Sequence, residues 1–206
     1  MKRVGLVLFS MVAIALICSG SALAQGDNST YFVTYYANNV SGAPDATLRA
    51  INDGSAGAYG GNLFADFYVF DDSEELVTCC SCEVTPDGLL SESVKAMTKD
   101  AIRGVAPTRG VIKVISSSTP FNPTKETPPP NGTVEVDTAG LRLWATHIQS
   151  SANKNPNGPA PYDQTETALA DSNWTSGEQG LLELICWADA WFGGTPCPCT
   201  PEDEDF

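Results

Sequence analysis

The sequence predicts a mainly β protein: an antiparallel β-sandwich of the Ig-like type, with about seven strands and one C-terminal amphipathic helix packed on it. Three observations predict this class. Short runs with β-type periodicity follow one another, turn residues separate them, and a helical pattern begins only after residue 172. Helices between the strands would instead indicate a parallel α/β sheet.

Seven runs have the composition and alternation of strands. They are Tyr31–Tyr36, Ala46–Ile51, Leu63–Phe70, Glu75–Val84, Leu89–Val94, Val111–Ser116 and Leu141–Gln149. The third run is apolar on both faces, since Phe64, Tyr68 and Phe70 alternate with Leu63, Phe67 and Val69. We therefore expect it to be a central strand.

The turn Thr85–Gly88 separates the fourth and fifth runs. Pro86 presets φ at the first corner, and Gly88 accepts the left-handed conformation that closes a hairpin, so we expect the flanking strands to pair antiparallel. Residues 116–132 and 150–162 are rich in Pro, Asn and Ser, which predicts long loops between the ends of the sheets.

Residues 175–192 show helical periodicity. Thr175 with Glu178, or Ser176 with Gln179, offers a capping box. The apolar stripe that we expect to face the sheet consists of Leu181, Leu184, Ile185 and Ala188 with Trp191 or Phe192, and it stops at Gly193-Gly194. Trp187 and Trp191 are four residues apart and share a face, which serves either core packing or carbohydrate stacking.

Residues 1–24 have the three parts of a secretory signal peptide. Lys2 and Arg3 precede a predominantly apolar region of 14 residues from Val4 to Ile17, and Ala22-Leu-Ala24 is a small-x-small cleavage site. A lipoprotein anchored at Cys18 is an alternative, although Ile17 is a poor residue before a lipidated cysteine. The mature chain is expected to be one disulfide-stapled domain over residues 25–199, followed by an acidic tail over residues 200–206.

Composition excludes two classes of partner. The chain has 11 Lys+Arg against 25 Asp+Glu, a formal net charge of −14, so it lacks the basic stripe that nucleic acid requires. The apolar run of the leader is shorter than the roughly 20 residues that cross a bilayer, and no later segment approaches that length. We therefore expect a protein with neither a nucleic-acid partner nor a membrane span, located in the periplasm, at the cell surface or in the medium.

Six cysteines remain after the leader, and an even number in an exported chain predicts disulfides. They form two groups, Cys79, Cys80 and Cys82 before the turn, and Cys186, Cys197 and Cys199 in the helix and tail. Bridges between cysteines one or two positions apart demand strained backbone, so we expect pairing between the groups, which leaves six arrangements.

Strand geometry narrows the pairing further. Cys80 and Cys82 point to one face of a strand and Cys79 to the other, which favours joining Cys80 and Cys82 to Cys197 and Cys199, and Cys79 to Cys186. A zinc site made by the same thiolates is the alternative. Its spacing is Cys-x-Cys rather than the two-residue gap of zinc ribbons, and an oxidising compartment competes for the thiols, so we expect no metal and no cofactor.

No catalytic set is assembled in the sequence. His147 is the single histidine and lies on an alternating strand, where a structural, hydrogen-bonded histidine is expected. Asp66, flanked by aromatic residues, is a candidate acid for a paired-carboxylate glycosidase, with an ion pair or a solvated sheet edge as the alternative. No nucleophile elbow, phosphate loop or zinc-protease motif occurs.

Four segments together resemble a group of secreted, Cys-containing proteins of acidobacterial-type soil bacteria that have no assigned activity. The segments are Asn62–Asp71, Cys79–Gly88, Gly110–Val114 and Trp144–Gln149. This resemblance implies export and a shared cysteine pattern, and it implies no catalytic residue.

These features favour a non-enzymatic secreted protein that acts as a structural, adhesive or fibre-forming subunit. In one version, Tyr31–Tyr36 is donated to the sheet edge of a neighbouring copy; the alternative is an ordinary first strand in its own sheet. The partners expected are copies of the chain or an extracellular glycan. Two other functions stay open: a small carbohydrate-active enzyme or carbohydrate-binding module that uses Asp66, Trp187 and Trp191, and a metal-binding domain.

Overall fold

The structure is a computed structural model, and it describes residues 29–38, 40–56, 61–99, 106–121, 136–151, 161–194 and 196–199. The predictions that concern the signal peptide, Cys18 and the acidic tail lie outside these residues.

Strands dominate the part of the chain that is described. They are β1 (Tyr31–Ala37), β2 (Thr47–Asn52), β3 (Leu63–Asp71), β4 (Leu76–Val84), β5 (Leu89–Ser93), β6 (Arg109–Ser117), β7 (Leu141–Ser150), β8 (Tyr162–Ala168) and β9 (Ala170–Asp171). Two helices accompany them, α2 (Val94–Met97) and α3 (Ser176–Trp191). Each of the seven predicted runs overlaps one of the strands β1 to β7.

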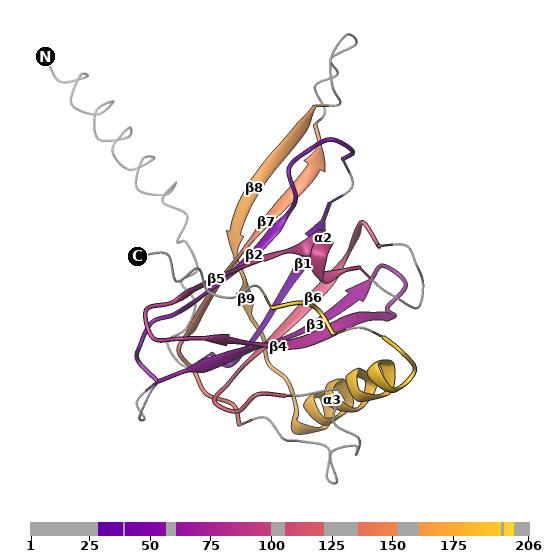
Figure 1. The fold of residues 1–206 in the computed structure, drawn as a ribbon. Helices are drawn as coiled ribbons and strands as arrows, with labels where there is room; N and C mark the ends of the chain where they lie inside the picture. Colours follow the sequence, from indigo (N-terminus) through magenta and orange to yellow (C-terminus); the bar gives the residue numbers. More distant parts are fainter. Residues whose placement is uncertain are drawn as a thin grey trace, which may run out of the picture.

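The strands form two antiparallel sheets (Figure 1). One has the order β4-β3-β6-β1-β9 and the other the order β5-β2-β7-β8. The prediction of a mainly β protein with antiparallel sheets and a C-terminal helix is therefore confirmed.

One hydrophobic core draws on both sheets. Phe32 and Phe67 come from the five-stranded sheet, Leu48 and Leu143 come from the four-stranded sheet, and all are fully buried. A second, smaller cluster lies on the other face of the five-stranded sheet, where Tyr68 and Ile115 contact Leu182 of α3. Strand β3 is thus covered on both faces, as its two apolar faces predict.

The turn after β4 differs from the prediction in two ways. The residue in the left-handed region is Asp87, with φ of 63°, rather than Gly88. The amide of Gly88 donates to the carbonyl of Thr85, which closes a four-residue turn. The flanking strands do not pair with each other, because β4 pairs with β3 and β5 pairs with β2. The turn carries the chain from one sheet to the other.

Gly110 marks a close approach of three strands. It pairs with Tyr36 of β1 and Asp71 of β3, and a Cβ at this position would collide with the carbonyl oxygen of Phe70. We expect Gly110→Ala to lower the free energy of unfolding by more than about 2 kcal/mol. The colliding atom belongs to the backbone of β3, which cannot move aside as the end of a flexible side chain can. Urea denaturation measures this. Gly177→Ala is the control, since its Cβ would meet only ordinary contacts, and an equal loss in both variants would contradict the prediction.

Candidate functional site

Three disulfides fasten the C-terminal part of the chain to β4. They are Cys79–Cys186, Cys80–Cys197 and Cys82–Cys199, with Cα–Cα distances of 5.8, 5.3 and 5.4 Å. The amide of Cys197 also donates to the carbonyl of Cys79 at 3.3 Å. The prediction of disulfides is confirmed, and the pairing follows the strand faces: Cys79 faces α3, whereas Cys80 and Cys82 face the core.

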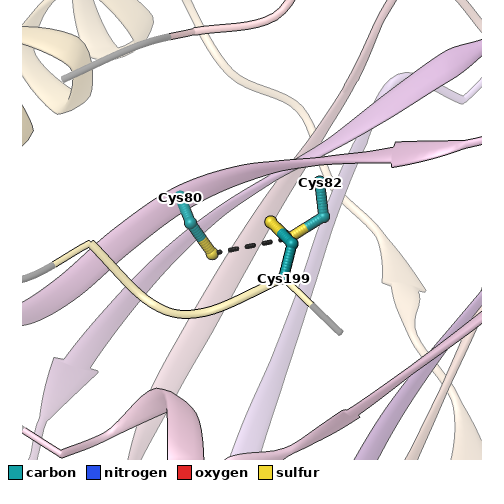
Figure 2. A group of neighbouring side chains, drawn as sticks. All are labelled: Cys80, Cys82 and Cys199. Atoms are coloured by element: carbon teal, nitrogen blue, oxygen red, sulfur yellow. Dashed lines mark hydrogen bonds between the residues drawn. A yellow bond between two sulfur atoms is a disulfide. The ribbon is translucent and has the colours of Figure 1, made fainter. Parts of the chain in front are cut away.

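Two of these bridges are close neighbours. The Sγ atoms of Cys80 and Cys82 lie 3.7 Å apart, and Cys199 completes a compact sulfur group (Figure 2). Metals bind thiolates, and a sulfur in a disulfide carries no thiolate charge. In the oxidised state shown by the structure, the group therefore acts as a crosslink, and metal binding would require its reduction.

Asp66 lies on β3 beneath α3 and is 1% exposed. Its Oδ2 accepts a hydrogen bond from Ser117 at 2.6 Å, and its Oδ1 is buried without a hydrogen-bond partner among the described residues. Burial, together with the neighbouring Glu183 carboxylate of α3, raises the pKa of Asp66 to about 7 against the opposing effect of the serine hydrogen bonds. Glu183 is also fully buried.

This environment corrects both interpretations of Asp66. Asp66 forms no ion pair with any described residue, and its strand is internal rather than at a solvated sheet edge; its charged neighbour is another carboxylate. A glycosidase acid must touch its substrate, and Asp66 has almost no accessible surface. The arrangement instead places two carboxyl groups, one on the sheet and one on the helix, in a buried environment where both cannot ionise at low cost.

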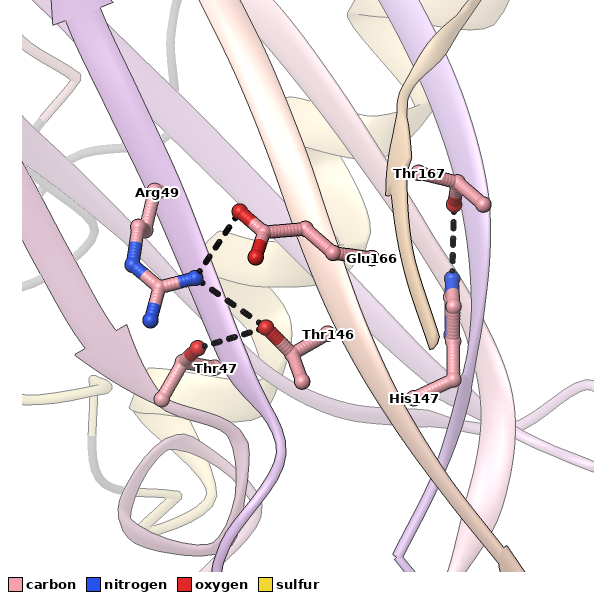
Figure 3. Close-up of polar contacts among 6 residues, drawn as sticks. All are labelled: Thr47, Arg49, Thr146, His147, Glu166 and Thr167. Carbon is pink, nitrogen blue, oxygen red and sulfur yellow. Dashed lines mark hydrogen bonds and ion pairs between the residues drawn. The ribbon is translucent and has the colours of Figure 1, made fainter. Parts of the chain in front are cut away.

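His147 is buried beneath Tyr35. The two rings are stacked with centroids 4.0 Å apart, and Nε2 lies 2.9 Å from Oγ1 of Thr167 on β8 (Figure 3). Nδ1 is buried and has no hydrogen-bond partner in the described part of the chain. Burial lowers the pKa of His147, so the ring is neutral at pH 7. Its contacts are those of a side chain that holds β8 against β7.

A polar network on the opposite face also holds β8. Nη1 of Arg49 donates to Thr146 at 3.0 Å and to Glu166 of β8 at 3.1 Å, and Thr47 donates to Thr146 at 3.1 Å (Figure 3). The Arg49–Glu166 ion pair is half-exposed and thus contributes little stability by itself. Contacts on both faces nevertheless fix the register of β8 on β7.

Strand β8 has an unusual position. All seven of its residues are exposed, so it contributes no side chain to the core. The sequence pattern predicted no strand here, because Tyr162–Ala168 has no apolar face to produce an alternation. The signal available was its threonine and tyrosine content, which favours strands only weakly.

The four edge strands of the two sheets differ in length and in what covers them. The tail with Cys197 runs along β4, β9 has two residues, and the five residues of β5 lead directly into α2. Strand β8 pairs with β7 on one side, and no described segment pairs with its other side. We call this side of β8 the open edge. Unpaired amides and carbonyls at such an edge can pair with another strand.

Helix α3 begins as predicted but is rotated from the expected orientation. Thr175 is the N-cap and accepts from the amide of Glu178. The face against the sheet contains Gln179, Leu182, Glu183 and Cys186, whereas Leu181, Leu184, Trp191 and Phe192 of the predicted stripe are exposed. Of that stripe, Ile185 packs against the smaller cluster. The Cys79–Cys186 disulfide fixes this rotation, because Cys186 must point at β4.

Trp187 and Trp191 therefore lie away from the sheet. Their ring centroids are 5.6 Å apart with the planes inclined by 28°, and Trp191 is 64% exposed. The two side chains do share a face, but that face is not a core-packing one. Near the other end of the helix, Glu178 accepts from Lys113 at 2.5 Å and from Tyr31 at 3.3 Å, which anchors α3 on β1 and β6.

No family model, curated protein or solved structure matches the chain. No helix within the described residues has the length and apolarity needed to cross a bilayer. The surfaces identified by geometry are the open edge of β8 and the exposed apolar side of α3. The sequence pattern missed the first, and it assigned the second to the core.

Proposed function

We propose that this protein is exported and is a non-enzymatic structural or adhesive subunit, which associates with copies of itself through the open edge of β8. Export is supported by three disulfides, since such bonds persist in oxidising compartments. The fold we infer is an Ig-like β-sandwich, supported by a core that draws on both sheets. We also propose that the chain belongs with the secreted acidobacterial-type proteins that it resembles.

The observation that carries the proposal is the open edge itself. A strand with no buried side chain adds almost nothing to the stability of its own core. It is nevertheless held in register from both faces, by His147 through Thr167 and by Arg49 through Glu166. A strand of seven residues that is fixed in register on β7, and whose other side pairs with no described segment, has the geometry required for β-strand addition.

The sequence of β8 suits pairing with a second β8. In an antiparallel pair centred on Thr165, Asp163 lies opposite Thr167 of the second copy, and Gln164 lies opposite Glu166. No carboxylate faces another directly, so the like-charge penalty of cross-strand pairs is avoided. The pair is symmetric, as expected of a two-fold contact between identical chains.

This proposal assigns association to β8 rather than to donation of the first strand. In the structure, β1 pairs with β6 and β9 of its own chain. Donating Tyr31–Ala37 to a neighbour would break these pairings, whereas pairing at the open edge breaks none.

Two adjacent proline substitutions test the open edge. The amide of Leu169 donates to the carbonyl of Leu143 on β7, and amides alternate in direction along a strand. The amide of Thr165 therefore points to β7, and that of Gln164 points to the open edge. We expect the unaltered protein to associate with rising concentration in sedimentation velocity. Gln164→Pro, the outward variant, should weaken association by at least about tenfold, while its circular dichroism and disulfides stay unchanged.

Thr165→Pro serves as the matched control, because this inward variant loses a bond to β7 and not a bond to the partner. A monomer at every concentration of the unaltered protein, with no particles in electron microscopy, would overturn the proposal. If both variants associate as strongly as the unaltered protein, the chain self-associates, but not through β8, and the assignment of the contact to the open edge is overturned.

A further inference from the structure

The geometry points to a second self-association surface: we propose that the exposed apolar side of α3 pairs antiparallel with the same side of α3 in another copy. We call this surface the α3 seam and define it as Leu181, Leu184, Ala188 and Trp191. The inference deepens the proposed function. The helix pair forms without β8, so only an assembly that uses both contacts rests on the proposed function.

The distribution of polarity on α3 is inverted relative to an ordinary surface helix. Glu183 and Gln179 are buried, with exposed fractions of 0% and 3%, whereas Leu181 is 55% exposed and Leu184 is 46% exposed. The covalent link at Cys186 and the N-terminal contacts of Glu178 hold the helix in this orientation. The apolar side therefore faces outward in the folded chain and requires a partner to leave water.

The spacing of the α3 seam identifies the shape of that partner. Successive residues are three, four and three positions apart, which is the repeat by which one helix packs along another. Within the described residues, α3 is the helix with more than one turn; α2 has four residues. A second copy of α3 is thus the partner that the chain itself supplies.

An antiparallel register centred on position 186 gives complementary layers. Leu184 then lies opposite Ala188 of the second copy, and Leu181 lies opposite Trp191. Each layer thus joins unlike side chains, and one of them sets leucine against the small alanine, which lets the helices approach closely.

The apolar area of the α3 seam is compatible with a contact between two copies. The seam contains no charged side chain, and the formal net charge of −14 repels a second copy as it repels any other anionic surface, so the contact depends on apolar burial alone. With full side-chain areas of roughly 150–250 Å², Leu181, Leu184 and Trp191 of the seam and the neighbouring Phe192 expose roughly 450 Å² together. Full burial of these side chains in two copies removes roughly 900 Å² from water, which is the size of a weak or transient interface.

Two different self-complementary contacts on one chain produce an extended assembly. Each contact alone closes as a dimer, but alternation of the two propagates without limit. Strands β7 and β8 project from the body on the side away from α3, so both contacts can form on one subunit (Figure 1). The expected product is a filament in which open-edge and α3-seam contacts alternate.

A charge-exchange pair tests the register. Leu184→Glu places an acid on the seam, and Ala188→Lys places a base at the position opposite. We expect each variant alone to raise the dissociation constant of the seam contact at least about tenfold. An equimolar mixture should regain the affinity, because the introduced carboxylate of one chain then faces the introduced ammonium group of the other. Sedimentation velocity of the purified proteins at two salt concentrations is the measurement.

Three controls separate this inference from the proposed function. Leu89→Glu makes the same change at an exposed leucine of β5 and should leave association unchanged. In the outward proline variant of β8, the seam should still yield discrete dimers, whereas the seam variants should yield dimers joined through β8. Circular dichroism and an intact disulfide count establish that each variant is folded.

Other outcomes overturn the inference. A mixture of Leu184→Glu and Ala188→Lys that stays as weak as its components would exclude the antiparallel register. In another outcome, the unaltered protein shows no α3 contact in sedimentation, while its tryptophan fluorescence shifts on addition of cellohexaose or chitohexaose. That pair of results would assign the surface to a glycan instead. A blue shift on addition of neutral phosphatidylcholine vesicles would assign it to lipid.

Discussion

Full reduction and alkylation of the native protein is expected to unfold it at 25 °C. The three disulfides join residues separated by 107, 117 and 117 positions. In the chain-entropy model, the first bridge over a loop of this length contributes about 4.7 kcal/mol. With two further bridges, the loss exceeds about 5 kcal/mol, which is comparable to the whole stability of a small domain.

Single bridges are expected to differ in a defined order. With the other two bridges intact, Cys79–Cys186 closes an effective loop of roughly a dozen residues and contributes about 3 kcal/mol. Cys82–Cys199 lies beside Cys80–Cys197, so its effective loop is only a few residues and its contribution is about 2 kcal/mol. The double variants Cys79→Ala with Cys186→Ala and Cys82→Ala with Cys199→Ala measure both values in guanidinium denaturation.

Mass spectrometry supplies the decisive control for this prediction. Native, mature protein should take up no alkylating reagent at these six positions until a reductant is added. Uptake at all six without a reductant, or an unchanged unfolding curve after complete reduction, would contradict the crosslinked fold.

The contribution of Asp66 to the free energy of unfolding is expected to rise as the pH falls from 8 towards 4. The folded pKa of Asp66 is about 7, above its ordinary value of 3.8, so the folded state binds a proton that the unfolded state releases. The destabilisation caused by the ionised Asp66 carboxylate is complete above pH 7 and disappears below pH 4. The shift corresponds to a change on the order of 4 kcal/mol for this fully buried group.

Asp66→Asn is the matched variant, because it imitates the protonated side chain. It should be more stable than the unaltered protein at pH 8, and the difference should vanish near pH 4. Burial lowers the pKa of His147, which removes stability below about pH 6.5 in both proteins and cancels in this difference. Glu183→Gln should reduce the same dependence. A difference that is constant across the pH range would refute the role of Asp66.

The sequence predicted those elements whose local pattern coincides with their environment. Strand β3 alternates between two buried faces, and the three cysteines of β4 follow the strand period. The strand and the Cys79–Cys186 bridge could therefore be derived, whereas the order in which Cys80 and Cys82 join Cys197 and Cys199 could not. Strand β8 could not be derived, because a strand that buries nothing has no hydrophobic period. Its place in the sheet depends on contacts with His147 and Arg49, which are distant in the sequence.

Helix α3 shows a different reason for failure. Its existence and its cap follow from local sequence, but its rotation is set by Cys186 and by the anchoring of Glu178, both of which are tertiary contacts. Periodicity identifies an apolar stripe and assumes that the stripe faces the core. A covalent constraint can override that assumption, and the buried pair Asp66 and Glu183 could be recognised only once the rotation was known.

The placement of the three bridges also affects how the protein responds to proteases. Each bridge joins β4 to a residue more than 100 positions later in the chain. A single cut anywhere between Cys82 and Cys186 therefore leaves two fragments that remain covalently attached. On a non-reducing gel such nicked material runs as one species, and within a filament a damaged subunit would keep both of its neighbours.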